Sequence, residues 1–357
     1  MLFYIIISLI LLLFVFLPQK VDKLTYSLSV FFIFILGAFR DKSVGTDTKG
    51  IYWGNFKLTT LDPGTWSHYT PFEPGYNVFI GLLKEYVCPS YELFYGLSFA
   101  IFFICFVVFL NKTSVRPLVA LFFFIAVGYL GFSFNAMRQC VALGLACLSI
   151  VYLLENGKNV KYLIVIMLIS ILFHKSFMLM MILPIFRFEW IKSFLTKKIL
   201  YIIILVCYVA FLFHEHFVNI FYLIIPYLHE RYATYLSGAL YVYGRIEVSP
   251  KMVTIDTLVC VLCIFLARKK DFSIYFWIYI IGVLMQLLLL PLSYIFHRLI
   301  TVWMLFGIVI YSNLWDTDIK YKVYFRTVLI IYAFGRFYIA LSRNYNEIIP
   351  YSNWLFN

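Results

Sequence analysis

The chain has 357 residues, of which 64% are hydrophobic and 21% aromatic, whereas only 13% are charged. A water-soluble domain of that composition would expose large apolar patches, so a soluble enzyme or binding module is excluded. The formal net charge is +12. Its basic residues gather in short segments between apolar stretches, a pattern typical of membrane topology rather than of nucleic-acid binding.

Apolar stretches occupy most of the chain. A helix that crosses the hydrocarbon core needs about 20 apolar residues, and we predict an all-α, polytopic transmembrane bundle of about 11–13 membrane helices. We expect a single integral membrane domain over residues 1–357. The expected spans are 2–17, 24–39, 91–110, 117–133, 136–154, 160–173, 175–187, 199–213, 252–267, 272–290, 295–313 and 322–341. The first is preceded by no basic segment and ends at no small-residue cleavage site, so we expect it to remain as a helix.

Basic residues recur after every second expected crossing, which predicts that these segments face the cytoplasm and that both termini lie outside. The clusters are Lys20/Lys23, Lys112/Arg116, Lys158/Lys161, Arg187/Lys192/Lys197/Lys198, Arg268–Lys270 and Lys320/Lys322/Arg326.

Two outer loops, residues 40–90 and 214–251, are too long to be simple connectors. Both are rich in aromatic residues and proline, which argues against disorder. Tyr76–Val87 in the first loop and Phe217–Leu228 in the second are apolar but too short to span. We expect both to be re-entrant or interfacial helices, and we expect any chemistry on this outer face.

A break at Phe173-His174-Lys175-Ser176 interrupts the apolar residues 160–187. The stretch before it has about 14 residues and would reach only about 21 Å, short of the roughly 30 Å hydrocarbon core. The break would then lie below the membrane surface, where irregular backbone is tolerated only if it is buried in protein or lines a cavity. This geometry predicts that His174 is a cavity residue.

Arginines mark the outer ends of several expected helices. Arg138 lies about three residues into an apolar stretch, and Arg298 and Arg336 take comparable positions. An ionised guanidinium at membrane depth costs about 2.5 kcal/mol or more, so it normally faces a cavity or a partner. Its planar fork suits phosphate oxygens, and several such groups would suit a diphosphate. Snorkelling to the headgroups explains any single one equally well.

Further candidates lie in the two loops. Arg231 and Arg245 stand among tyrosines, a composition suited to sugars and anions and also to an interfacial aromatic belt. Asp47 follows Gly45 by two residues, and Glu73 precedes Gly75 by two residues. Glycine at these positions allows tight turns. Held at a membrane rim, either carboxylate could act as a general base; the alternative is a turn cap or an ion pair.

Common signatures of energy-coupled or hydrolytic enzymes are missing from the sequence. It holds no nucleotide-binding loop, HExxH or GxSxG motif, so the driving force would have to arrive with the substrate. Asp47 and Glu73 could hold a metal, but no ligand spacing requires one, and we expect no cofactor.

Taken in order, these motifs resemble the EpsG-like family of bacterial polysaccharide polymerases, which are Wzy-type enzymes and include O-antigen polymerases. The resemblance is carried by Arg40…Gly45-Thr46-Asp47…Tyr52, Phe72-Glu73-Pro74-Gly75-Tyr76, Arg138 at the start of a helix, Phe173-His174-Lys175-Ser176 and Arg231-Tyr232…Tyr235. It covers about residues 25–310, and the last helix and the tail after Arg343 add nothing to it.

The resemblance implies a GT-C-like membrane fold in the bacterial inner membrane, with the active face in the periplasm. The substrate would be an oligosaccharide repeat on undecaprenyl diphosphate, transferred as a growing chain to the next lipid-linked repeat. Arg138 with Arg298, Arg40 and Arg231 or Arg245 would bind the diphosphate or sugar, and Asp47, Glu73 or His174 would be the base. A separate chain-length regulator would be a partner.

Two alternatives remain. An O-antigen ligase uses the same donor with a different acceptor. A flippase or transporter of lipid-linked sugar would show two similar halves and charges near the midplane, whereas this sequence has no internal repeat and gathers its charges at one rim.

Overall fold

A computed structural model describes residues 1–66, 72–215, 249–268, 271–292, 296–316, 321–344 and 346–354. Within these ranges the regular structure is helical, and no strand forms beyond an isolated bridge between Arg40 and Asn353. Four described helices are long and apolar enough to cross a membrane, or up to five if one bent pair counts as a span. The all-α polytopic membrane fold is thus confirmed, whereas the number of about a dozen crossings stays a prediction.

Two compact units make up the chain. The first comprises Met1–Ile182 and Trp315–Asn357, and the second comprises Leu183–Leu314. The long helices of the first unit are α1 (Leu2–Phe16), α2 (Asp22–Ala38), α5 (Tyr91–Thr113), α6 (Pro117–Ala126), α7 (Tyr129–Asn135), α8 (Met137–Ser149) with η5 (Ile150–Leu154), α9 (Asn159–Leu172) and α19 (Lys322–Arg343).

The second unit begins within a tight 3₁₀ helix, η6 (Lys175–Arg187), whose first residues belong to the first unit. Its helices are α10 (Glu189–Phe194), α11 (Lys197–Leu212), α15 (Pro250–Leu266), α16 (Ile274–Leu289), α17 (His297–Met304) and α18 (Gly307–Trp315, whose last residue belongs to the first unit). Within it, α16 packs on α11, α15 and α17. Gly282 allows α16 to approach α17 closely, because a Cβ there would lie 2.8 Å from the Met304 nitrogen.

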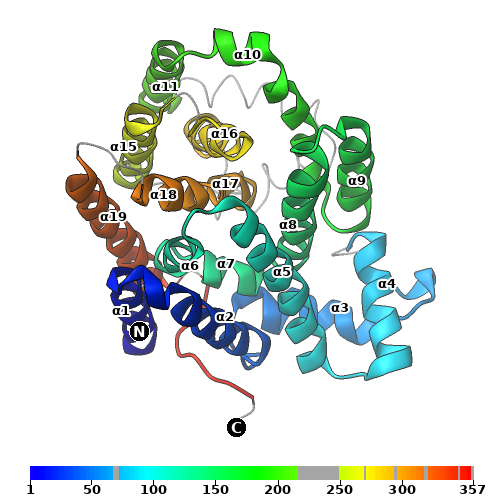
Figure 1. Cartoon of the computed structure of the whole chain (residues 1–357). Coiled ribbons are helices and arrows are strands. Elements are labelled where there is room, and N and C mark those ends of the chain that lie inside the picture. Colours follow the sequence, from blue (N-terminus) through cyan, green and yellow to red (C-terminus); the bar gives the residue numbers. More distant parts are fainter. Residues whose placement is uncertain are drawn as a thin grey trace. The chain divides into compact units, whose positions relative to one another are not determined.

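The centre of the first unit is a wholly apolar helix. Every residue of α6 from Leu118 to Ala126 is buried, as expected for a helix that is hydrophobic on all sides. Helices α1, α2, α5 and α19 pack against it (Figure 1). The α5–α8 contact is close at Gly144, where a Cβ would lie 3.0 Å from that of Cys105.

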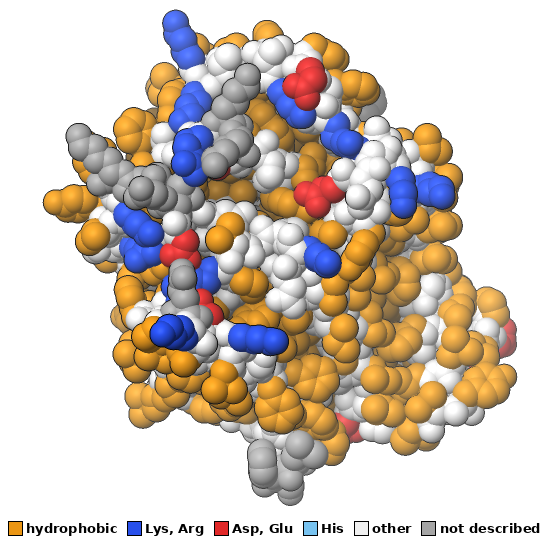
Figure 2. Space-filling view, in the orientation of Figure 1, with side chains coloured by type: hydrophobic (Ala, Val, Ile, Leu, Met, Phe, Trp, Pro, Cys, Tyr) orange, Lys and Arg blue, Asp and Glu red, His pale blue; other side chains and the backbone are white. Residues whose placement is uncertain are grey.

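Large hydrophobic side chains remain exposed along the surrounding helices. They recur at helical spacing, for example Leu2, Ile6, Leu9 and Leu13 on α1. Hydrophobic side chains also cover much of the surface in Figure 2, where Lys and Arg gather over part of the face turned to the viewer. An apolar surface of this extent is compatible with lipid and not with water.

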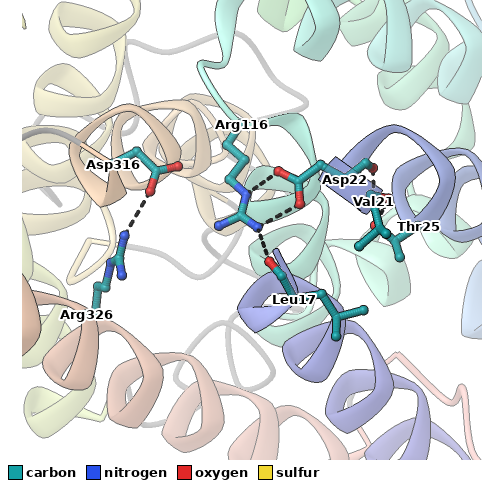
Figure 3. Close-up of polar contacts among 7 residues, drawn as sticks. All are labelled: Leu17, Val21, Asp22, Thr25, Arg116, Asp316 and Arg326. Carbon is teal, nitrogen blue, oxygen red and sulfur yellow. Dashed lines mark hydrogen bonds and ion pairs between the residues drawn. The ribbon is translucent and has the colours of Figure 1, made fainter. Parts of the chain in front are cut away.

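One end of the first unit carries the basic segments. The guanidinium of Arg116 donates to both carboxylate oxygens of Asp22, at 2.6 and 2.7 Å, and to the carbonyl of Leu17 at 3.3 Å (Figure 3). Arg326 pairs with Asp316 at 2.8 Å. Phe16 at the end of α1 contacts Trp315, 6.1 Å between ring centroids.

The other end of the same helices carries the first loop and the C-terminal tail. Tyr4 at the start of α1 donates to the carbonyl of Ile348 at 3.1 Å, and Arg40 after α2 donates to that of Phe134 at 3.3 Å. Basic segments and loop residues therefore lie at opposite ends of α1 and α2, as the predicted alternation of crossings requires.

One expected span is broken, and one expected break between spans is present. The predicted span 117–133 is not straight: α6 and α7 are bent by 67°, and Gly128 takes a positive φ of 96° between them. Such a backbone conformation suits glycine, which has no Cβ to clash. The break after 173 is confirmed, since α9 ends at Leu172 after 14 residues and η6 begins at Lys175.

The described part of the first loop is folded. It contains η2 (Thr48–Tyr52), α3 (Trp53–Leu58), η3 (Pro63–Thr65), α4 (Pro74–Leu82) and η4 (Leu83–Val87), so the helix expected over 76–87 is present. Lys84 closes α3 by donating to the carbonyls of Phe56, Lys57 and Thr59 at 2.8–3.2 Å. Desolvation lowers the pKa of Lys84. The segment 217–228 lies outside the described residues.

Replacing Arg116 by Gln should destabilise the protein by about 2 kcal/mol, because the substitution removes a charged, bidentate hydrogen-bonded pair. The side chains of Arg116 and Asp22 are only 10% and 22% exposed, so water replaces the pair poorly. The measurement is thermal unfolding of the purified protein in detergent. Lys112→Gln, an exposed change in the same basic segment, is the control; equal unfolding temperatures for the two variants would contradict the prediction.

Candidate functional site

Four segments that are distant in sequence meet at the N-terminus of α8. They are Gly45–Tyr52, Phe72–Tyr76, Met137–Gln139 and Phe173–Ser176, four of the five motifs on which the family resemblance depends. An aromatic cluster joins them, and the partly buried Phe173 packs against it. The buried members of this cluster are Tyr52, Phe56, Phe72, Tyr76, Ile80, Leu83, Tyr91, Phe94, Tyr95, Met137 and Val141.

Arg138 is the second residue of α8 and forms an ion pair with Glu73, the residue before α4. The side chains are 20% and 11% exposed. The guanidinium also stacks over Phe72, 4.2 Å from its centroid, and the Arg138 backbone N–H donates to the Tyr52 hydroxyl at 3.2 Å. The Arg138 Nε is buried and has no hydrogen-bond partner among the described residues.

A cation is unusual at the N-terminus of a helix such as α8. A helix N-terminus carries a partial positive charge and favours anions, so Arg138 adds a like charge to that end of α8. Glu73, itself at the N-terminus of α4, offsets it. The arrangement is therefore a positive end that already holds one carboxylate and could hold another anion.

The Gly45-Thr46-Asp47 turn lies against the C-terminal end of α7. That helix ends at Asn135, three residues before Arg138. Gly45 has φ 109°, and a Cβ there would meet the Thr48 Oγ1 at 2.9 Å. The Asp47 N–H donates to the Asn135 side-chain oxygen at 3.0 Å, and Thr48 donates to the Phe134 carbonyl at 3.0 Å. Asp47 is buried with 9% exposure. These hydrogen bonds fix the turn to Phe134 and Asn135, which precede Arg138 by four and three residues.

Arg40 lies completely buried below this turn. It donates to the carbonyls of Gly37 at 2.7 Å and Phe134 at 3.3 Å, which belong to the last turns of α2 and α7. Its guanidinium lies between the rings of Tyr95 and Phe134, 4.8 and 4.7 Å from their centroids. Burial lowers its pKa, yet arginine stays charged at neutral pH, and the two negative helix ends stabilise that charge. Its side chain also donates to the sulfur of Met137, the residue before Arg138, at 3.3 Å.

The C-terminal tail holds the turn from the other side, which the sequence did not reveal. Gly45 N–H donates to the Glu347 carbonyl at 3.0 Å, and the Asn135 amide donates to that of Asn346 at 2.9 Å. Lys49 forms an ion pair with Glu347. The tail has no apolar periodicity or motif, so only long-range contacts reveal its role.

His174 lies in the break after α9. Its Nδ1 is 2.7 Å from the Ser176 hydroxyl, and the Gln139 amide donates to that hydroxyl at 3.4 Å. Gly75 at the start of α4 packs so tightly on Leu172 that a Cβ would come within 2.7 Å of the Leu172 Cβ. We assigned no role to Gln139 or Ser176 from the sequence. A polar glutamine beside Arg138 in an apolar helix would nevertheless have indicated a functional position.

Arg298, Arg231 and Arg245 are not among the described residues of the first unit. Arg231 and Arg245 lie outside the described residues. Arg298 is exposed near the start of α17 in the second unit. Its role therefore stays a prediction.

A buried polar pair in the second unit was also not predicted from the sequence. Gln286 in α16 donates to the carboxylate of Asp256 in α15 at 2.8 Å, and Asp256 is completely buried. Among the described residues no group of three or more His, Cys, Asp or Glu side chains could hold a metal ion.

The fold and this site define a helical membrane protein that holds a paired arginine at one end of a bundle. The chain matches the model of the EpsG family over residues 23–353 and belongs to that family. The match includes α19 and the tail, so our expectation that these add nothing to the likeness is wrong. Comparison with curated proteins and with solved structures gives no match.

Glu73 and Arg138 should be coupled in stability by about 2 kcal/mol, as expected of a charged hydrogen bond that is mostly buried. A double-mutant cycle of Glu73→Gln, Arg138→Gln and the double variant measures it through thermal unfolding in detergent. The exposed pair Lys192–Glu189, 41% and 86% exposed, is the control and should give about 0.3 kcal/mol. Similar coupling in both pairs would mean that the buried ion pair adds no stability of its own.

Proposed function

We propose that this protein polymerises lipid-linked oligosaccharide repeat units by glycosyl transfer in polysaccharide or O-antigen biosynthesis. The observation that carries the proposal is Arg138 at the N-terminus of α8, met there by the first loop and by the break after α9. Membership of the EpsG family supports a polysaccharide polymerase type of role.

The donor is an oligosaccharide on undecaprenyl diphosphate. In the reaction the anomeric C–O bond to the diphosphate breaks, a new C–O bond to the acceptor hydroxyl forms, and undecaprenyl diphosphate leaves. Negative charge grows on the leaving diphosphate, and Arg138 together with the positive end of α8 is suited to stabilise it. Arg298, Arg231 and Arg245 stay candidates for the same task, and a separate chain-length regulator is a proposed partner.

A base must accept the proton of the acceptor hydroxyl. Asp47 and Glu73 are carboxylates at the same end of the bundle, and His174 is the third candidate. Glu73 is held by Arg138, so it becomes available as a base only when another anion takes over the guanidinium.

The site is proposed to face the periplasm from the bacterial inner membrane. It lies at the end of α1 and α2 opposite the basic segments around Arg116 and Arg326, and basic segments prefer the cytoplasm. A lipid-linked repeat in the outer leaflet would reach this end directly.

Arg138→Ala should lower polymerisation by about 10²–10³-fold, the usual loss when one group that stabilises a developing anion is removed. The assay is a lipopolysaccharide ladder gel from a strain that makes this chain's own repeat unit and lacks its gene, complemented with each variant at matched expression. Arg343→Ala, an exposed arginine at the end of α19, is the control and should keep the ladder.

A single-repeat band with Arg138→Ala and a full ladder with wild type would support the proposal. If loss of the gene removes even the single-repeat band, the chain acts as a ligase or flippase instead. If Arg138→Ala keeps the full ladder, Arg138 is a structural residue.

Cys88 should react with a membrane-impermeant thiol reagent in spheroplasts, because it is exposed at the end of η4 in the first loop. Cys105, Cys140, Cys147, Cys207, Cys260 and Cys263 lie within helices. Cys88→Ser is the control that should abolish the signal. Labelling that appears only after the cells are broken would place the first loop in the cytoplasm and overturn the proposed orientation.

A further inference from the structure

The break after α9 fixes the hydrogen bonding of one ring nitrogen of His174. The Ser176 hydroxyl oxygen lies 2.7 Å from Nδ1, and the Ser176 backbone N–H also points at Nδ1, at 3.4 Å. A backbone N–H can only donate. Nδ1 therefore accepts at least this contact, which is possible only if it carries no proton.

Gln139 holds the Ser176 hydroxyl that makes the shorter contact. Its side-chain amide N–H donates to the Ser176 hydroxyl oxygen at 3.4 Å, and Gln139 is almost completely buried, with 2% exposure. Because Nδ1 carries no proton, the Ser176 hydroxyl must be the donor in the 2.7 Å contact, while its oxygen accepts from Gln139. Both donors of Ser176 thus converge on Nδ1.

A neutral imidazole has one proton, so a proton-free Nδ1 places it on Nε2. This is the reverse of a histidine base of the serine-protease type, in which Nδ1–H donates to a carboxylate and the bare Nε2 takes the proton. Nδ1 of His174 is engaged with Ser176, and Nε2 in this tautomer is a donor.

We infer that His174 takes part in the reaction as an Nε2–H donor to an oxygen of the lipid-linked substrate, and that Ser176 and Gln139 are the positioning residues that hold it in this tautomer. The inference rests on the proposed function and deepens it. General-base catalysis is then left to the carboxylates Asp47 and Glu73.

Packing connects this donor to the diphosphate-binding end of α8. Phe173, the neighbour of His174, packs into the aromatic cluster that contains Met137, and Gln139 directly follows Arg138. Gln139 therefore links Ser176 to the turn of α8 that carries Arg138. A donor at this place would complement Arg138 on an oxygen-rich substrate.

Substitution of His174 separates a donor from a base. Gln places an amide N–H at about the distance of Nε2 but does not accept a proton at catalytic pH. If His174 donates, His174→Gln should keep the rate of repeat transfer within about 10-fold of wild type, whereas His174→Ala should lose about 10²-fold. Equal, large losses in both variants at matched expression would overturn the inference, since a base requires imidazole.

The tautomer is measured directly by ¹⁵N NMR of the purified protein labelled at its six histidines, with His174→Gln used to assign the signal. At pH 8, above the ordinary histidine pKa of about 6.5, Nδ1 of His174 should be unprotonated and Nε2 protonated. Ser176→Ala keeps the backbone N–H and removes only the hydroxyl contact, so it should change the ¹⁵N shift of Nδ1 without placing a proton there. Ser176→Thr, which keeps the hydroxyl, should restore the wild-type shift.

Ser170→Ala is the matched control, because the Ser170 hydroxyl in the last turn of α9 donates to the Lys175 carbonyl at 2.9 Å and not to His174. It should leave the Nδ1 signal unchanged. A protonated Nδ1 in wild type, or an unchanged spectrum in Ser176→Ala, would overturn the inference. The spectrum decides this even if the chain fails to polymerise repeat units, so failure of the proposed function is a separate outcome.

Discussion

The ion pair between Arg138 and Glu73 joins the first loop to the membrane bundle, and the arrangement of the site depends on it. A guanidinium near the start of an apolar helix requires a partner, because neither lipid nor the positive end of α8 offers one. Glu73 supplies it from the start of α4. Because α4 also packs on Leu172 through Gly75, the same contact brings the break after α9 towards α8.

The buried cations of the first unit are compensated in different ways. Arg116 has a carboxylate, Asp22, with two short hydrogen bonds. Arg40 has no ion pair with a described carboxylate and instead relies on the carbonyl ends of α2 and α7. An ion pair between arginine and a carboxylate suits a permanent contact between two helices. A guanidinium held by helix ends and aromatic rings keeps the turn at Gly45 in place through carbonyl groups and ring faces.

The division of tasks at the site follows from these environments. Arg138 has a buried Nε without a partner among the described residues, so it can accept a further anion in addition to Glu73 or in exchange for it. Ser176 supplies donors to His174, and Asp47 is held in place by the hydrogen bond from its backbone N–H to Asn135. Substrate binding and proton transfer would then fall to different residues.

The sequence by itself determined the helical membrane class, the break at His174, the helix start at Arg138 and the family, because apolar periodicity and short motifs are local properties of the chain. Only the tertiary structure determined which residues distant in sequence pair with one another. Glu73 lies 65 residues from Arg138 and Asn346 lies 211 from Asn135, and nothing in local composition encodes such pairings. The bend at Gly128 and the role of the tail were decided in the same way, since packing against distant helices, not propensity, fixes them.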